Sequence, residues 1–417
     1  MLRFDDTDIE RVRDEYCEMI PLDMSWLGLK YDIFAKQSDR LLRYEEAKNL
    51  LIKSGRLYEC YESQEELSLQ RKSQIASGIT PIYNRAALNL TTEQREILKQ
   101  QGLKPHYRFL LQDKIVNWND KIKGQITYDG RHFSDPVLVR DNNVPTYTFC
   151  SVVDDLDFGV TDIIRGEDHI TNTAIQIQIF EALIEAGTSG VVPNFSHLAL
   201  VKASEGKISK REGGFDVKTL RAEGFEAFAV VSLLSQIGTS EPIKIYKNFD
   251  DLIANFSFTK FSKSSTNYDL SELVSINQKL LQILDFEDVK ESLKNLDLAE
   301  ITEEFWQIMR TNITILKDIK KWWEICKKPL NFENAKKDHE FLQLAADLLP
   351  QDTKDKECWN KWISSIKQNT DRKGKDLFSP LRLALSGEEH GPEMKFLVNF
   401  ISREEILRRL MPFQLSN

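Results

Sequence analysis

The sequence contains no stretch of about eighteen consecutive apolar residues, so we expect no membrane-spanning helix and no membrane partner. Cysteine is scarce. The five cysteines are odd in number and scattered over 417 residues, which argues against a disulfide framework and for a reducing compartment. The first residues also lack the basic and apolar regions of a secretory signal. These absences together predict cytoplasmic localisation.

A strong excess of positive charge is also missing. The chain has 65 acidic and 56 basic side chains, a net charge of −9, whereas proteins that bind nucleic acids are usually basic. Binding of RNA would therefore require basic groups gathered on one face. The apolar content of 41% and charged content of 29% are typical of globular proteins. A chain of 417 residues is too long for one core, so we expect about two to four domains.

A short basic segment at residues 207–211, K-I-S-K-R, is the most informative pattern in the chain. Lys207 and Lys210 bracket Ser209, and two glycines follow at 213–214. A loop of this composition can fold over a polyphosphate, and positioned cations stabilise the charge of a phosphate under attack. A single segment of this kind is more often a solvated basic turn, so its interpretation depends on the motifs that accompany it.

The segment resembles the K-M-S-K-S loop of class I aminoacyl-tRNA synthetases, and further motifs narrow the resemblance. Residues 3–8, R-F-D-D-T-D, are similar to a block of the glutamyl-tRNA synthetases. The chain is identified as a member of the bacterial type of this family because the other blocks follow in the family's order. These blocks are S-D-P-V-L-V-R at 134–140, P-T-Y at 145–147, V-V-D-D at 152–155, D-I-I-R-G-E-D-H at 162–169 and the P-L-R to H-G-P segment at 380–392.

The resemblance implies an α/β plus all-α architecture. Residues 1–55 and 146–212 would form a split Rossmann-type catalytic domain. The connective insertion between them, an α/β segment at 56–145, would bind the acceptor end of tRNA. A helical stem-contact domain at 213–305 and a helical anticodon-binding domain at 306–417 would follow.

One family signature is absent, because none of the six histidines stands in an H-x-G-H motif. We therefore expect an incomplete Rossmann-type domain whose first strand is missing, through a misplaced start or a truncated gene, and poor adenylation of glutamate. Two interpretations remain open. One is a glutamyl-tRNA synthetase, which ligates L-glutamate to tRNA-Glu through a glutamyl-adenylate. The other is a catalytically silent tRNA-binding protein derived from such an enzyme.

The resemblance also implies which residues bind glutamate. Arg165 would read the side-chain carboxylate, since a guanidinium can bond a carboxylate through two parallel N–H groups. Alternatively, Arg165 forms a structural ion pair with Asp162 or Glu167. Asp5 would bind the substrate ammonium group, or alternatively cap the following helix. Tyr147 would contact the substrate, or alternatively belong to the core.

Lys207 and Lys210 would be the catalytic residues that hold the ATP phosphates, and Ser209 would complete the ATP site. Mg²⁺ would arrive with ATP, held by phosphates and water rather than by the protein. The family's zinc knuckle opens with C-x-C, but Cys60 stands alone here, and one cysteine cannot make a four-ligand site. We therefore predict no zinc. The expected partners are tRNA-Glu, with tRNA-Gln left open, L-glutamate and ATP, for a monomeric protein.

Local patterns predict the elements around these residues. Residues 41–54 and 171–186 have the apolar period of amphipathic helices. The apolar run at 147–153 is predicted as a buried strand, with the two carboxylates at 154–155 at its carboxyl end, where open α/β sheets place ligands. The Asp-Gly pair at 129–130 predicts a hairpin turn between β-prone flanks.

Overall fold

The computed structural model describes residues 1–7, 13–203, 216–268, 270–330 and 338–411. Within these residues, no helix is both long and apolar enough to cross a membrane. The chain divides into two compact units. The first comprises Met1–Lys207, Gln236–Ile243 and Asn255–Tyr268, and the second comprises Ile208–Ser235, Lys244–Ala254 and Asp269–Asn417.

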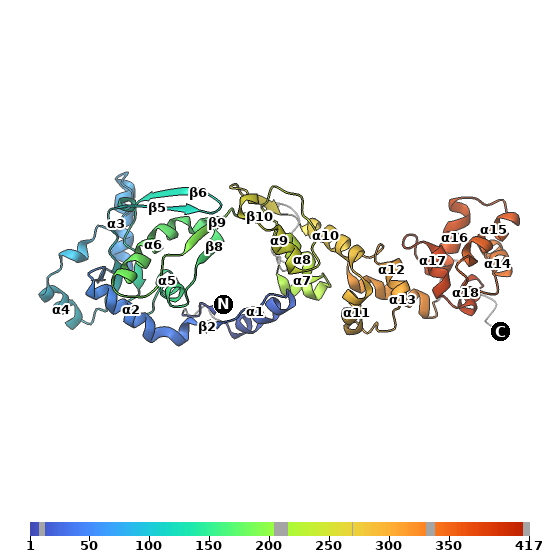
Figure 1. Ribbon diagram of the computed structural model, residues 1–417, viewed down its shortest axis with the longest axis horizontal. Helices are drawn as coiled ribbons and strands as arrows, with labels where there is room; N and C mark the ends of the chain where they lie inside the picture. The colour runs from blue at the N-terminus through green and yellow to red at the C-terminus, as the bar shows by residue number, and fades with distance from the viewer. Residues whose placement is uncertain (8–12, 204–215, 269, 331–337, 412–417) are drawn as a thin grey trace. The chain divides into compact units, whose positions relative to one another are not determined.

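The first unit contains a β–α–β arrangement that carries Arg165. Strand β8 (Asp162–Gly166) runs parallel to β9 (Asn194–Leu198), and α6 (Ile170–Glu185) connects them, as parallel strands require (Figure 1). The helix predicted at 171–186 is therefore confirmed. In the register of this pair, Arg165 lies opposite His197. A second parallel pair joins β1 (Leu2–Phe4) to β2 (Phe34–Lys36), and a third joins β10 (Val201–Ala203) to β11 (Thr266–Tyr268).

The residues predicted as a strand at 147–153 instead belong to helix α5 (Tyr147–Asp157), so that prediction is wrong. Every residue from Phe149 to Leu156 is buried, which leaves the segment without a polar face. A segment buried on all sides shows neither the helical nor the strand period, and its Val and Phe content favoured a strand. As a result, Asp154 and Asp155 lie on a buried helix rather than at the end of a strand.

The core of this unit forms where α2 (Leu41–Lys53), α5 and α6 pack together, and α2 confirms the helix predicted at 41–54. Helix α1 (Asp14–Trp26) precedes β2 along the chain. The largest fully buried side chains of the core are Tyr44, Phe109, Phe149, Phe180, Phe195, Leu51, Leu111, Leu138 and Ile179.

The segment predicted as an insertion folds around a three-stranded antiparallel sheet. Strand β4 (His106–Phe109) lies between β3 (Leu57–Cys60) and β7 (Val137–Val139). Helices α3 (Gln64–Ala76) and α4 (Thr92–Gln100) follow β3, and both begin with a capping box. In this motif, the side chains of the cap residue and of the third helical residue each accept a hydrogen bond from the other residue's main-chain N–H.

The hairpin of this segment does not turn at Asp129-Gly130, so this prediction is also wrong. Strand β5 (Ile115–Asp120) pairs with β6 (Gly124–Asp129), and the turn lies between them. Gly124 adopts the left-handed conformation, with φ of 84°, that favours glycine. Gly130 serves close packing instead, because a Cβ there would collide with the main-chain oxygen of Gln112.

The second unit is helical, as the family resemblance implies for the residues after 213. Trp306 and Trp362 are fully buried, and their indole N–H groups donate to main-chain oxygens of Leu284 and Ala345, so they are core residues rather than stacking platforms. Its helices are α7 (Val217–Glu223), α8 (Ala227–Leu234), α9 (Phe249–Asn255), α10 (Leu270–Ile283), α11 (Phe286–Asn295), α12 (Glu303–Met309), α13 (Ile319–Lys327), α14 (His339–Asp347), α15 (Cys358–Gln368), α16 (Lys375–Ser386), α17 (Met394–Leu397) and α18 (Arg403–Leu410).

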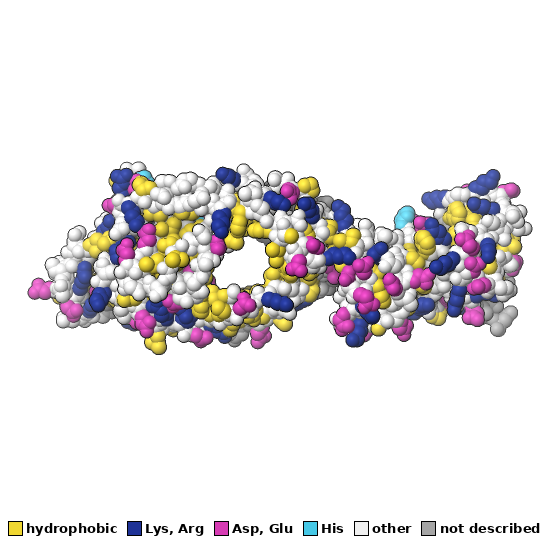
Figure 2. Space-filling view, viewed as in Figure 1, with side chains coloured by type: hydrophobic (Ala, Val, Ile, Leu, Met, Phe, Trp, Pro, Cys, Tyr) yellow, Lys and Arg dark blue, Asp and Glu magenta, His cyan; other side chains and the backbone are white. Residues whose placement is uncertain are grey.

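Figure 2 shows how charge is distributed over one face of the molecule. Over the C-terminal helices, Lys and Arg side chains are interspersed with Asp and Glu side chains. This face therefore carries no broad basic field, and any RNA contact on it would rely on individual cationic groups rather than on a continuous patch.

Candidate active site

Arg165 is held by two uncharged side chains of α6. Its Nη2 donates to Thr173 Oγ1 at 2.6 Å and to Gln176 Oε1 at 2.7 Å. Its Nε is buried and has no hydrogen-bond partner among the described residues. Burial lowers the pKa of Arg165, although Tyr147 and Asp155 act in the opposite direction. The guanidinium is thus positioned by neutral groups and keeps N–H groups for a ligand.

The alternative role of Arg165, an ion pair with Asp162 or Glu167, is not observed. Asp162 pairs with Lys121, and Glu167 pairs with Lys123. Both carboxylates are therefore engaged with lysines that follow β5. No carboxylate is bonded to the Arg165 guanidinium within the described part of the chain. A buried cation of this kind is suited to binding an anionic ligand.

Thr173 is hydrogen-bonded to a buried histidine, which in turn is hydrogen-bonded to a buried aspartate. His197 Nε2 is 2.9 Å from Thr173 Oγ1, and His197 Nδ1 is 2.6 Å from Asp120 Oδ2. Both the His197 and the Asp120 side chains are completely buried. Burial lowers the pKa of His197 and outweighs the attraction of Asp120, so the imidazole is neutral at physiological pH. With Nδ1–H directed at the carboxylate, Nε2 accepts the Thr173 proton, which leaves the Thr173 oxygen to accept from Arg165.

A second branch of hydrogen bonds joins Arg165 to the start of α5. Gln176 Nε2 donates to Ser151 Oγ at 3.0 Å, and Ser151 Oγ donates to the main-chain oxygen of Tyr147 at 2.8 Å. Gln176 and Ser151 are both buried. The position of Arg165 is therefore coupled to that of Tyr147, the residue predicted to contact the substrate beside it.

Tyr147 itself is the first residue of α5 and is 44% exposed, so it is not a core aromatic. Its ring centroid lies 6.4 Å from that of His169. The structure thus places Tyr147 and Arg165 in one neighbourhood, with the tyrosine ring accessible to a ligand.

Asp5 follows β1 and is bonded by Arg3, whose Nε donates to Asp5 Oδ1 at 2.9 Å. The same guanidinium donates through Nη1 to Asp155 Oδ1 at 3.0 Å. Asp5 does not cap α1, which begins after Arg13. Burial raises the pKa of Asp155, while Arg3 acts to lower it. Asp155 is also one of the acidic groups that act on Arg165, so Asp5 and Arg165 are linked through Arg3 and Asp155.

The predicted ATP residues Lys207, Ser209 and Lys210 lie outside the described residues. Their roles stay predictions that rest on the K-I-S-K-R segment.

Asp154 is an important residue that the sequence did not assign. Its fully buried carboxylate accepts from Arg40 Nε at 2.8 Å, Tyr44 Oη at 2.9 Å and Gln37 Nε2 at 3.1 Å. Arg3 also lies within ion-pair distance, at 3.5 Å. Through these hydrogen bonds, Asp154 connects α5, the helix that carries Tyr147, to the residues around the start of α2. Its partners lie more than a hundred positions earlier in the chain, so no local signal reveals them.

Cys60 is not as isolated as its sequence neighbourhood suggests. Antiparallel pairing brings His106 opposite Cys60, and the ligand-type atoms of Cys60, Glu62 and His106 all lie within 4.8 Å of one another. Burial raises the pKa of Cys60 to about 12. Glu62 Oε1 accepts from Tyr83 Oη at 2.6 Å, whereas Glu62 Oε2 and His106 Nε2 are buried and have no hydrogen-bond partner in the described part of the chain.

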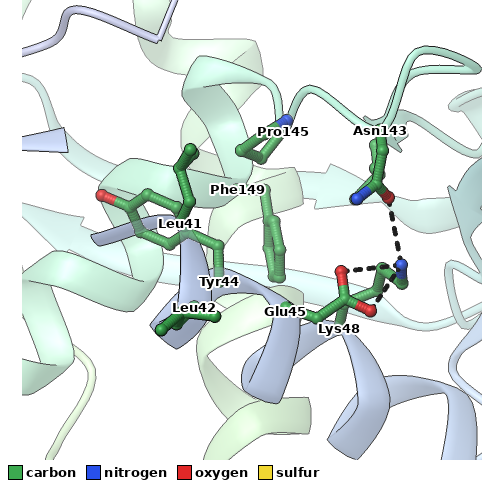
Figure 3. A pocket seen from close by; sticks show the side chains of 9 residues that line it. Leu41, Leu42, Tyr44, Glu45, Lys48, Asn143, Pro145 and Phe149 are labelled. Carbon is green, nitrogen blue, oxygen red and sulfur yellow. Dashed lines mark hydrogen bonds and ion pairs between the residues drawn. The ribbon is translucent and has the colours of Figure 1, made fainter. Parts of the chain in front are cut away.

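A hollow of about 240 Å³ lies beside α2, but it is not the candidate active site (Figure 3). None of Asp5, Tyr147 and Arg165 lines it. Its one amine, Lys48 Nζ, is paired with Glu45 at 2.8 Å and also bonds Asn143, so no free cation faces the hollow. The apolar wall comes from Leu41, Leu42, Tyr44, Val139, Pro145 and Phe149.

The chain is similar to proteins of one known family. Residues 1–275 match the family model of the class I tRNA synthetase catalytic domain for E and Q, and residues 273–413 match an anticodon-binding domain. A glutamate–tRNA ligase 2 of Rickettsia canadensis and a glutamate–tRNA ligase 1 of Rickettsia akari are each 49% identical over 98% of this chain and 91% of their own.

Two solved structures also align with nearly the whole chain. A glutamate–tRNA ligase of Elizabethkingia meningosepticum, crystallised with its amino acid, aligns with a TM-score of 0.82 at 25% identity and covers 99% of this chain and 91% of its own. A glutamate–tRNA synthetase of Elizabethkingia anophelis aligns with a TM-score of 0.79, also at 25% identity, over 99% and 92%. The chain therefore belongs to the class I tRNA synthetases of the glutamate and glutamine family, with a catalytic domain followed by an anticodon-binding domain.

Proposed function

We infer that this protein is a glutamate–tRNA ligase, which uses ATP to join L-glutamate to tRNA-Glu. The observation that carries this inference is the 49% identity to glutamate–tRNA ligases over 98% of the chain. The guanidinium of Arg165 supports the same substrate, because no carboxylate of the described residues is bonded to it and glutamate would bring one. The alternative of a silent tRNA-binding protein is not favoured, since these relatives are named as ligases.

The proposed reaction has two steps. An oxygen of the glutamate α-carboxylate attacks the α-phosphate of ATP, and the bond to pyrophosphate breaks. A hydroxyl of the terminal adenosine of tRNA then attacks the activated carbonyl, and AMP leaves. Arg165 binds the γ-carboxylate, Asp5 binds the ammonium group and Tyr147 contacts the bound amino acid. Since the substrates supply the reacting groups, the protein contributes mainly positioning and electrostatics.

The insertion at 56–145 is proposed to hold the acceptor end of tRNA, residues 213–305 to contact its stem and residues 306–417 to bind the anticodon. Mg²⁺ would accompany ATP, coordinated mainly by phosphate oxygens. The protein is proposed to act as a monomer in the cytoplasm, and charging of tRNA-Gln is left to experiment. Transfer of labelled glutamate to purified tRNA tests the function directly, and no transfer by a folded sample would contradict it.

Replacing Lys207 or Lys210 by alanine is expected to lower the rate of glutamate-dependent ATP–pyrophosphate exchange by roughly tenfold each, the effect of losing one hydrogen bond to a charged group. The KM for glutamate should change little, since the lysines are proposed to act on ATP. Lys218→Ala, an exposed lysine of α7, is the matched control and should exchange normally. Unchanged exchange in both loop variants would remove these residues from the ATP site.

We also propose that the Cys60 cluster holds no zinc. Structural zinc takes four ligands, and among the described residues only Cys60, Glu62 and His106 converge. Burial raises the pKa of the Cys60 thiol, which disfavours the thiolate form that binds zinc. Elemental analysis of purified protein should find far less than one zinc per chain. Stoichiometric zinc that disappears in Cys60→Ser would show that a cation occupies the cluster instead.

A further inference from the structure

A second polar hollow, of about 360 Å³, lies between helix α3 and the segment around Tyr83. We refer to it as the α3 hollow. Gln74 Nε2 donates to the main-chain oxygen of Ile82 at 2.8 Å and so ties the helix to the opposite wall. No Asp or Glu of the described ranges lines the hollow. Its polar lining consists of Gln70, Arg71, Gln74, Tyr83, Arg108 and Ser134.

Arg108 is the buried cation of the α3 hollow, with only 9% of its surface exposed. Its Nη1 donates to the main-chain oxygen of Asp135 at 2.7 Å, and its guanidinium lies 4.3 Å from the centre of the Tyr83 ring. Its Nε is buried without a hydrogen-bond partner among the described residues. The Asp135 carboxylate is bonded by Tyr58 and Arg85 instead. A buried cation without a counterion is unfavourable, so an anion would stabilise this site.

The other polar groups of the α3 hollow are also hydrogen-bond donors. Arg71 lies on the exposed side of α3 and forms no ion pair within the described ranges. Ser134 Oγ accepts the main-chain N–H of Tyr83 at 2.8 Å, which leaves the hydroxyl proton available. The α3 hollow therefore combines a buried and an exposed guanidinium with a free hydroxyl, a set of donors suited to an oxyanion with several acceptor oxygens.

We propose that the α3 hollow binds a phosphate group, held by Arg71, Arg108 and Ser134. Two sources share this chemistry, a backbone phosphate of RNA and a free phosphate ion. The position of the hollow, in the segment proposed to hold the acceptor end of tRNA, favours the RNA backbone, and only this choice of source rests on the proposed function. The site itself follows from the donors and the unpaired charge.

The experiment compares Arg71→Gln with Lys72→Gln, which removes the same charge from the neighbouring position of α3 without lining the hollow. Gln70→Glu places a carboxylate among the donors. Arg108 is left unchanged because it is buried. Arg71 and Lys72 are exposed and Gln70 is partly buried, and thermal melts should confirm that each variant is folded like the unaltered protein.

In the first arm, the full chain is titrated with inorganic phosphate, followed by the amide signals of residues 67–83. We expect about tenfold weaker binding in Arg71→Gln and in Gln70→Glu, and unchanged binding in Lys72→Gln. In the second arm, tRNA affinity is measured between about 50 and 200 mM salt. The slope of log affinity against log salt should fall by about one in Arg71→Gln but not in Lys72→Gln.

A response in the tRNA arm identifies the ligand as a backbone phosphate, and a response in the phosphate arm alone identifies a free ion. If neither arm separates Arg71→Gln from Lys72→Gln, the proposal is overturned. If the unaltered protein binds no tRNA, the proposed function fails, whereas the phosphate arm still decides whether the α3 hollow is an oxyanion site.

Discussion

Replacing Arg165 by alanine is expected to lower kcat/KM for glutamate by roughly 10²-fold or more, which corresponds to about 3 kcal/mol of transition-state stabilisation. The side chain is held by Thr173 and Gln176 and has no bonded carboxylate of its own. Its loss would leave the substrate carboxylate without its counterion. Steady-state ATP–pyrophosphate exchange at varied glutamate concentration measures the effect.

Arg165→Lys separates charge from geometry, because lysine keeps the positive charge but cannot donate two parallel N–H groups. We expect this variant to recover only part of the lost activity. Arg131→Ala is the matched control, since Arg131 is an exposed arginine of the same unit, paired with Asp129. Normal glutamate kinetics in Arg165→Ala would show that another residue reads the γ-carboxylate.

Replacing Asp154 by alanine should destabilise the first unit by about 3–5 kcal/mol, the cost of removing one partner from a buried ionic cluster. Arg40, Tyr44 and Gln37 would all lose the acceptor that they share. Arg40 would keep only its second carboxylate partner, Asp157. Thermal or urea unfolding, together with amide hydrogen exchange in α5, measures the loss.

The control for this prediction is Asp162→Ala. Asp162 also forms an ion pair, with Lys121, but both side chains are 38% exposed, and such pairs contribute about 0–1 kcal/mol. A destabilisation by Asp154→Ala no larger than that by Asp162→Ala would mean that α5 is held by its apolar packing alone.

The motifs predicted roles for Arg165, Asp5 and Tyr147, and the structure places these residues in linked positions. The motifs did not identify the hydrogen-bond partners that position them. Thr173 and Gln176 face Arg165 because α6 returns along β8, and His197 lies opposite because of the strand register. These contacts depend on how separate segments meet, and nothing in the local composition encodes them.

The errors in the predicted fold have a related cause. Helices α2 and α6 cover α5, so the segment is buried on every side. Such a segment has no regular alternation of polar and apolar residues from which a helix or a strand could be predicted. At Gly130, the glycine serves close packing against the main chain of Gln112 rather than a turn. In both cases tertiary contacts explain the residue types, whereas the prediction had attributed them to local secondary structure.

If Arg165 binds the substrate side chain as proposed, its uncharged hydrogen-bond partners affect how the site selects its amino acid. Glutamine matches glutamate in shape but carries no charge, so in this site it would leave a desolvated guanidinium without an opposing anion. Glutamate alone completes the charge balance. Discrimination would then arise chiefly as a penalty on the wrong amino acid rather than as extra attraction for the right one. An added carboxylate next to Arg165, even one that preserved the fold, would remove that penalty and make the site tolerant.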